Sequence, residues 1–220
     1  PFGDPTAAIH HHVAPYYLEK SGQEIGLPNV VTSVLASYRG YDTLGEVFVI
    51  FTAAIGVLLI IGRPQFGRRR SHRMLVGELH ESMRTNVILR VGSKLLIPVI
   101  LLFALYVQWH GDFGPGGGFQ AGVIFASGFI LYALIFDIDT ARTMIPARTT
   151  RLFLVFGVLL YTGVGVAGLF LGGNFLDYSV LAANPVSGQH LGILLVEFGV
   201  GLTVAAAMIS IFFTFAHQEH

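Results

Sequence analysis

The segment His110-Gly-Asp-Phe-Gly-Pro-Gly-Gly-Gly-Phe-Gln-Ala-Gly122 joins two long apolar stretches and contains six glycines and one proline. Glycine lets a backbone turn sharply and lets a second backbone approach closely. Because three consecutive glycines stand between two runs of membrane-spanning length, we expect a close backbone contact here rather than a slack connection.

The composition of the chain indicates an integral membrane protein. Hydrophobic residues make up 53% of the 220 residues and charged residues 12%, whereas soluble domains carry about 25% charged residues. The mean hydropathy is +0.67. Strand-like alternation is absent from the apolar runs, so the sequence predicts an all-α, polytopic fold. A net charge of zero argues against a nucleic-acid partner, and the absence of cysteine excludes disulfides and thiolate metal sites.

Five stretches are long and apolar enough to cross a bilayer, which requires about 20 apolar residues. The predicted spans are Leu44–Gly62, Asn86–Trp109, Phe119–Ile138, Leu152–Gly173 and Leu191–Phe215.

Basic residues predict the orientation of these spans. The first connection holds Arg63, Arg68, Arg69, Arg70, Arg73 and Arg84, and the third holds Arg142, Arg148 and Arg151. The other two connections contain no Lys or Arg. Since basic loops are retained in the cytoplasm, we expect the glycine-rich loop and the N-terminal segment to lie outside, and the C-terminus to lie inside.

The region before the first span divides into two parts. Residues 1–28 are polar and are predicted to form an irregular outer segment. Apolar residues then recur at helical spacing from Val30 to Tyr38, which predicts a short amphipathic helix of about three turns. Such a helix is too short to span a membrane and is expected to lie along the outer face.

Two parts of the chain resemble known membrane subunits. The motifs Asn86-Val-Ile-Leu-Arg90, Leu95-Leu-Ile-Pro98, His110-Gly, Pro115-Gly-Gly-Gly-Phe-Gln120 and Gly122 resemble the B subunit of the multisubunit Mrp-type Na+/H+ antiporters. Asn29-Val-Val and Tyr38-Arg-Gly-Tyr-Asp-Thr-Leu-Gly-Glu46 resemble the E-type segment of the large antiporter protein, which is a separate small protein in energy-converting hydrogenases. In one departure, Asp112-Phe-Gly114 lengthens the spacing between His110-Gly and the proline.

The resemblance implies four regions. They are an outer segment (1–28), an E-type segment (29–62), an Arg-rich cytoplasmic linker (63–85) and a B-subunit-like four-helix domain (86–220).

The function implied by the resemblance is that of an accessory subunit in a complex that exchanges Na+ for H+. The expected partners are the other membrane subunits and the lipid of a prokaryotic inner membrane. On this interpretation the chain is not an enzyme and has no cofactor or metal. Two alternatives stay open, namely the equivalent subunit of an energy-converting hydrogenase or related redox-driven pump, and a scaffold without ion contact.

Two carboxylates are candidates for an ion route. Glu46 completes a Thr43-Leu-Gly-Glu46 capping box in one interpretation; in the other, Glu46 and Asp42 belong to a vestibule that attracts cations. Glu197 lies inside the last span without a charged residue within one helical turn. A carboxylate in hydrocarbon must face protein or water, so Glu197 is either a titrating ion site or a hydrogen-bonded contact between helices.

The remaining candidates carry a basic group or provide packing. Lys94 precedes Pro98 by four residues, where proline removes a helical hydrogen bond and favours a kink; snorkelling of Lys94 to the cytoplasmic face is the alternative. The residues assigned to packing and to the family motif are Pro98, His110, Pro115, Gly116, Gly117, Gly118, Phe119, Gln120 and Gly122. The pair Gly168 and Gly172 is predicted to be a further helix crossing.

Overall fold

The computed structural model describes residue 4 and residues 6–8, 12–61, 86–114 and 116–219, which are helical with connecting turns and contain no strand. Five of the helices are long and apolar enough to cross a membrane. They are α3 (Gly40–Ile61), α5 (Val87–Trp109), α6 (Gly118–Ile135), α8 (Ala147–Phe170) and α9 (Pro185–Glu219). The predicted all-α, five-span fold is therefore confirmed.

Shorter elements flank these helices. They are α1 (Val13–Glu24), α2 (Val30–Thr32), the π-helical segment η2 (Ser33–Tyr38), α7 (Ile138–Met144) and the 3-10 turn η3 (Tyr178–Leu181). The third span ends at Ile135 rather than at the predicted Ile138, and α7 follows a break at Asp137. Ile138 continues the apolar run for one residue beyond Asp137, which is why the predicted span extends past the break.

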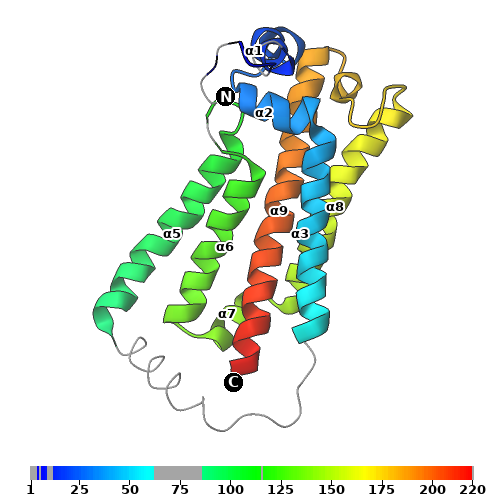
Figure 1. The fold of residues 1–220 in the computed structure, drawn as a ribbon. Helices are drawn as coiled ribbons and strands as arrows, with labels where there is room; N and C mark the ends of the chain where they lie inside the picture. Colours follow the sequence, from blue (N-terminus) through cyan, green and yellow to red (C-terminus); the bar gives the residue numbers. More distant parts are fainter. Residues whose placement is uncertain (1–3, 5, 9–11, 62–85, 115, 220) are drawn as a thin grey trace.

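Helix α9 is the central element, and α3, α6 and α8 each pack against it (Figure 1). Two thirds of its most apolar window is buried, against about a tenth for α3. Helix α5 contacts mainly α6 and leans away from the rest (Figure 1). The large apolar faces that stay exposed on α3 and α5 are those expected of helices that face lipid or other subunits.

Glycines permit the two closest helix crossings on α9. A Cβ built on Gly118 would lie 2.0 Å from the carbonyl oxygen of Glu197, and one on Gly122 would lie 2.6 Å from that of Gly201. On the other side of α9, a Cβ on Gly157 would lie 2.5 Å from the carbonyl oxygen of Gly199. The expected backbone contact of the glycine-rich segment is present, and its partner is α9.

The predicted crossing at Gly168 and Gly172 is wrong. A Cβ on Gly168 would meet backbone oxygens of the following loop at Asn174 and Asp177, 3.0 Å away, rather than another long helix. Gly172 has a φ of +88° and ends the turn after α8. These two glycines therefore close a helix end, and Gly157 makes the crossing.

The prediction that residues 1–28 are irregular is wrong for Val13–Glu24, which form α1. Contacts with the next segment stabilise this helix, because the Tyr16 and Tyr38 hydroxyls donate to the two carboxylate oxygens of Glu24 at 2.7 and 2.5 Å. The ring of Tyr17 also packs on that of Tyr38, with centroids 4.9 Å apart. These contacts come from residues far enough apart that local sequence could not predict them.

The predicted amphipathic helix is found as α2 and η2, and its register differs from that of a regular α-helix. Asn29 caps it by accepting a hydrogen bond from the amide of Val31 at 3.1 Å. Thr32, Ser33 and Ala36 are buried, whereas Val31 and Leu35 are exposed. Val31 and Leu35 are thus left uncovered by the helices of this chain, although they line a cavity described below.

One end of the molecule gathers α1, α2, η3 and the loop from His110 to Gly117, which we call the glycine-loop end (Figure 1). The C-terminus lies at the opposite end (Figure 1). This arrangement is the one that the arginine distribution predicts, although the side of the membrane that each end faces stays a prediction. The Arg-rich linker predicted at 63–85 lies outside the described residues.

Candidate functional site

Hydrogen bonds tie the N-terminal segment to the glycine-rich loop. The Asn29 side-chain amide donates to the carbonyl oxygens of Gly111 and Gly114 at 2.9 and 2.6 Å, and its backbone amide donates to the Asp112 carbonyl at 3.1 Å. The Thr32 hydroxyl adds a bond of 2.7 Å to the Gly111 carbonyl. Since buried polar groups are costly unless paired, these bonds fix the loop in one position.

A second set of hydrogen bonds joins η2 and the start of α3 to the C-terminal half. The Tyr178 hydroxyl donates to the Ala36 carbonyl at 3.0 Å, and the Tyr161 hydroxyl donates to the Gly40 carbonyl at 2.9 Å. Burial raises the pKa of Tyr178, which keeps its hydroxyl protonated as a donor. The regions that resemble two different subunits thus form one packed unit at the glycine-loop end.

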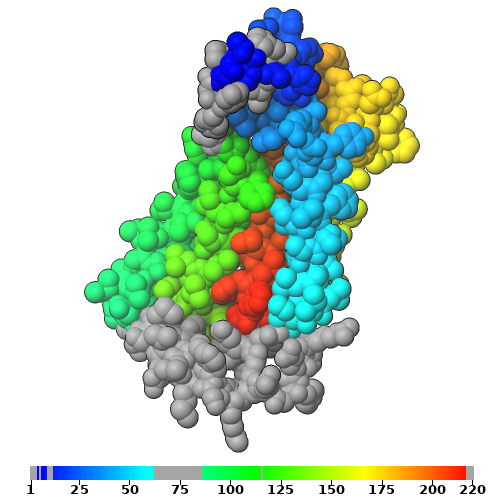
Figure 2. Space-filling view, in the orientation of Figure 1, coloured from blue at the N-terminus to red at the C-terminus, as the bar shows by residue number. Residues whose placement is uncertain are grey.

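A cavity of about 760 Å3 lies where these parts meet. Its walls come from residues 28–36, from α3, from the glycine-rich loop with the start of α6, from Tyr161 of α8 and from α9. Figure 2 shows atoms of α9 between the green α6 and the cyan α3, so α9 forms the floor of a furrow between those two helices. Glu46 and Glu197 both line the cavity, and none of its described lining residues is Lys, Arg or His.

Glu46 presents an exposed side chain to this cavity. The capping-box interpretation is wrong, because α3 begins at Gly40 and Thr43 already lies within its first turn. The Thr43 hydroxyl instead donates to the Leu35 carbonyl at 2.8 Å. The capping-box pattern places the helix start four residues too late, at Leu44 instead of Gly40, since Gly40 and Tyr41 do not resemble a helix start.

Glu197 enters the cavity from α9 and is half-buried. Its carboxylate lies against two glycines of the loop: a Cβ built on Gly111 would be 2.7 Å from Oε2, and one built on Gly117 would be 2.9 Å from Oε1. Side chains at either position would displace the carboxylate. The glycines of the motif therefore make room for Glu197 as well as for the backbone of α9.

Tyr161 of α8 lines the same cavity as the two carboxylates. It is fully buried on α8, lines the cavity, and is close enough to Glu46 and Glu197 to interact electrostatically with both. No sequence signal singles out this tyrosine, since it stands alone in an apolar span.

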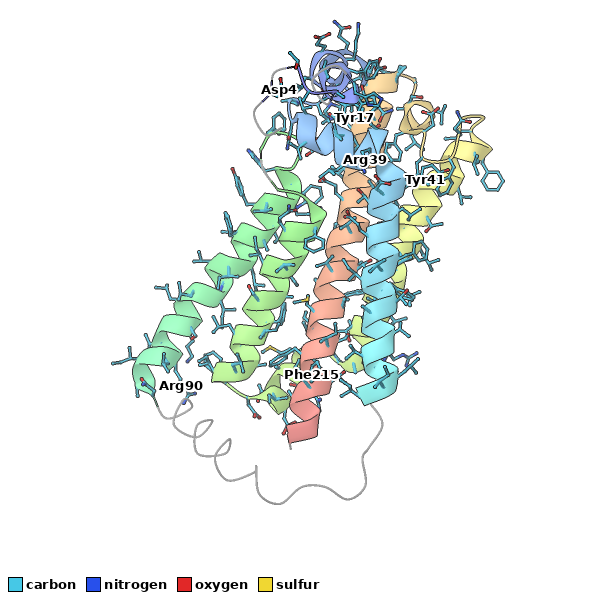
Figure 3. All side chains as sticks on the ribbon, viewed as in Figure 1. Asp4, Tyr17, Arg39, Tyr41, Arg90 and Phe215 are labelled. Atoms are coloured by element: carbon cyan, nitrogen blue, oxygen red, sulfur yellow. The ribbon has the colours of Figure 1, made fainter. Side chains whose placement is uncertain are left out.

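Asp42 and Lys94 lie outside the cavity. The carboxylate of Asp42 pairs with the Arg39 guanidinium at 2.5 Å on the exposed surface. Lys94 is exposed on α5, one turn beyond Arg90, which Figure 3 places at the opposite end of the molecule from Arg39. The Arg90 guanidinium lies 5.8 Å above the Phe136 ring. Helix α5 runs through Pro98 without a break in its helical assignment.

The motif residues have different positions. Gly116, Gly117, Gly118, Phe119 and Gln120 line the cavity, and Gly122 packs on α9. His110 lies outside it and stacks on Tyr106, with ring centroids 4.6 Å apart. Pro115 lies outside the described residues.

Sequence reasoning missed a histidine–carboxylate contact beside the cavity. Nδ1 of His190, near the start of α9, lies 3.2 Å from Oδ2 of Asp112 in the glycine-rich loop. Both side chains are partly exposed, at 37% and 21%. Each residue is recognisable in the sequence as an ionisable group near the end of a span, but their separation of 78 positions hides the contact.

This arrangement has an acidic character. Two carboxylates share a cavity whose described lining contains no basic side chain, and the volume exceeds that of a single water molecule, about 30 Å3, many times over. Ionisable groups in membrane helices commonly mark ion and proton pathways. Fold and site together define a multi-pass α-helical membrane protein with an acidic cavity at one end of its helices.

The family follows from comparison with known proteins. A family model described as "Domain related to MnhB subunit of Na+/H+ antiporter" matches residues 88–210, more than half of the chain, and a model of the E subunit of MBH matches residues 5–71. The chain belongs to the family of domains related to the MnhB subunit of Na+/H+ antiporters.

Two relatives illustrate how this chain compares in length. The A/B subunit of a probable K(+)/H(+) antiporter of Rhizobium meliloti (strain 1021) is 30% identical over 97% of this chain, which spans 23% of that protein's length. A putative antiporter subunit mnhB2 of Staphylococcus aureus (strain Newman) is 33% identical over 57% of this chain and 91% of its own length.

Two solved structures share the fold. A chain of the Mrp complex from Dietzia sp. DQ12-45-1b superposes with a TM-score of 0.69 and 27% identity, covering 92% of this chain and 22% of that one. A chain of the membrane-bound sulfane sulfur reductase, an archaeal respiratory membrane complex, gives a TM-score of 0.73 and 31% identity, covering 98% of this chain and 88% of that one.

Proposed function

We propose that this protein is a membrane subunit of a multisubunit antiporter that exchanges a monovalent cation, Na+ or K+, for protons. In this role it works with other membrane subunits in a prokaryotic inner membrane, with the glycine-loop end outside. Glu46 and Glu197 lie on the cation route, and the chain itself takes part in secondary transport rather than in an enzymatic reaction.

The observation that carries the proposal is the shared cavity of Glu46 and Glu197. These residues come from the two regions that match different family models, yet they line one space. Two carboxylates without a basic neighbour in that lining favour a positively charged occupant. The Mrp and antiporter relatives support the same type of transport.

The basic test is transport by the complex that contains this chain. The complex is purified with its partner subunits and reconstituted in proteoliposomes that contain a pH-sensitive dye. Addition of NaCl or KCl to the outside should drive proton movement without any redox substrate. If neither salt moves protons at any pH between 6 and 9, a range of about three units around neutrality, the proposal is refuted.

Two variants test the carboxylates separately. Glu46→Gln and Glu197→Gln keep the size of the side chain but remove its charge, so we expect assembled complexes with exchange slowed about tenfold or more, as roughly 1.4 kcal/mol on a barrier produces. Glu197→Asp should retain part of the rate because it keeps a carboxylate. The matched control is Glu19→Gln, an exposed glutamate of α1 away from the cavity. Wild-type rates in both cavity variants would leave Glu46 and Glu197 with structural roles only.

A second candidate is the equivalent subunit of a redox-driven ion pump. The specific observation in its favour is the match to a chain of the sulfane sulfur reductase complex, which this chain covers over 88% of its length. The two candidates differ in their energy source. Cation-dependent proton flux in proteoliposomes without electron donor supports the antiporter, whereas flux only during electron transfer supports the redox-driven pump.

A further inference from the structure

We propose that His190 and Asp112 form a proton-exchange pair that connects the aqueous side of the glycine-loop end to Glu197. This proposal rests on the proposed function, because it assigns the residues through which the antiporter's proton reaches or leaves the cavity.

The three side chains form a short series. Nδ1 of His190 lies 3.2 Å from Oδ2 of Asp112, which is hydrogen-bond distance. Asp112 directly follows Gly111, and a Cβ on Gly111 would lie 2.7 Å from Oε2 of Glu197. His190 and Glu197 are seven residues apart on α9, so they share one face of the helix about 10 Å apart. Asp112 therefore contacts His190 directly, and its neighbour in the chain, Gly111, lies against Glu197.

Within the pair, His190 is the member more exposed to water. The His190 side chain is 37% exposed and that of Asp112 is 21% exposed, whereas Glu197 lies against the glycine loop in the wall of the cavity. The imidazole of His190 has two ring nitrogens, so it can take up a proton on one and release a proton from the other. It is the group of the three that is best suited to contact the aqueous phase.

The loop is held rigidly, which keeps Asp112 in place during exchange. Asn29 donates to the backbone carbonyls on both sides of Asp112, at Gly111 and Gly114, and to the carbonyl of Asp112 itself. The carboxylate of Asp112 takes no part in these bonds and stays available to His190. The backbone anchors and the proton-carrying atoms are thus separate, so the side chain can be changed without releasing the loop.

The proton step involves only N–H and O–H bonds. A proton from water binds Nε2 of neutral His190, and Nδ1 releases its own proton to Oδ2 of Asp112. Asp112 then passes the proton to the Glu197 carboxylate, and the reverse sequence returns it to water. Each transfer breaks one bond to hydrogen and forms another, so no electron acceptor or further reactant is required.

Four groups determine how Glu197 responds to pH. Glu46 of α3 and Tyr161 of α8 line the cavity with it, Asp112 follows Gly111 in the loop, His190 lies about two turns earlier on its own helix, and the described cavity lining adds no Lys or Arg. When His190 is protonated it neutralises Asp112. When His190 loses its proton, Asp112 is left with an unbalanced negative charge beside Glu197, so the histidine determines the charge that the cavity carboxylate experiences.

The test uses the complete complex in proteoliposomes and measures cation-driven proton flux from pH 5.5 to 8.5, a range of about three units around neutrality. His190→Gln removes the titrating imidazole, and Asp112→Asn removes the carboxylate while keeping its backbone bonds to Asn29. The matched control is His12→Gln, since His12 is an exposed histidine beside α1 at the same end of the molecule.

We expect both variants to assemble, to exchange several-fold more slowly, and to lose the part of the pH profile that follows the histidine. Imidazole added on the side of the glycine-loop end should restore flux in His190→Gln, and the apparent KM for Na+ or K+ should stay unchanged. His12→Gln should match the wild type.

Two results overturn the proposal. One is wild-type rate and pH profile in His190→Gln and Asp112→Asn. The other is a loss of equal size at every pH that imidazole does not restore, which would make the pair a structural contact. Both results require that the wild-type complex exchanges cations for protons, so they are distinct from a failure of the proposed function, in which the wild type itself shows no exchange.

Discussion

Replacing Gly118 with alanine tests the helix crossing on which the cavity depends. The new Cβ would lie 2.0 Å from the carbonyl oxygen of Glu197 and 2.9 Å from the amide nitrogen of Gly201. Ordinary van der Waals contact begins near 3.4 Å, and both neighbours are backbone atoms that no rotamer change can move. Helix α6 must therefore move away from α9 by more than 1 Å at this point.

The magnitude follows from the cost of overpacking, which is about 1–3 kcal/mol for added methylene groups in a packed core. The higher helix propensity of alanine returns up to about 1 kcal/mol. We therefore expect a net destabilisation of about 1–2 kcal/mol, together with a shift of the Glu197 backbone. Thermal unfolding of the purified protein in detergent, followed by tryptophan fluorescence, measures the first effect.

The matched control is Gly163→Ala in α8, where no heavy atom lies within 4 Å of the added Cβ. It introduces the same methyl group into a membrane helix without a clash and should unfold at or slightly above the wild-type temperature. If Gly118→Ala and Gly163→Ala unfold at the same temperature, the close crossing of α6 and α9 is not a determinant of stability, and the reasoning fails.

Three further predictions concern the glycine-loop end. Gly117→Leu should reduce the yield of assembled complex on size-exclusion chromatography, because its side chain would displace the Glu197 carboxylate, which lies 2.9 Å from the Cβ position; normal yield would show that the loop tolerates bulk. A cysteine at Asn184 should react with a membrane-impermeant reagent from outside and one at Thr149 only from inside, and the reverse labelling would invert the topology. Hydrogen bonds from the Tyr38 hydroxyl and, to a smaller extent, from the Tyr16 hydroxyl lower the pKa of Glu24 below its ordinary 4.5. The stabilising contribution of Glu24 is therefore complete above pH 4.5 and is lost as the pH falls through the lowered pKa of Glu24. A spin label on α1 should become more mobile below about pH 4.5 in the wild type, whereas its mobility in Glu24→Gln should not depend on pH.

Hydropathy and arginine positions predict the five spans, because a membrane helix needs only length and apolar content to be recognised. The start of α3 escapes such a prediction because it depends on long-range bonds rather than on a local cap: Tyr161 binds the carbonyl of Gly40, and Thr43 binds Leu35. Helix α1 escapes it for a similar reason, since its stabilising contacts are made by Tyr38 in the next segment. Such contacts have no periodic signal in the sequence.

The candidate site can be predicted only one residue at a time. Glu46 and Glu197 stand out because carboxylates in apolar helices are rare, but nothing in the sequence indicates that they line the same cavity. The pair of Asp112 and His190 can be recognised only after the loop has been placed against the start of α9. Asp42, which is close to Glu46 in sequence, is instead paired with Arg39 on the surface.

The hydrogen bonds between residues 29–40 and the later helices have a consequence for how the gene product is organised. Asn29, Thr32 and the carbonyls of Ala36 and Gly40 all bind groups that follow residue 110, and α3 packs on α9. These contacts would hold the two parts together in a one-to-one ratio even when they are produced as separate polypeptides. Joining them in one chain adds effective concentration, so fusion or separation of the corresponding genes can occur without redesign of the interface.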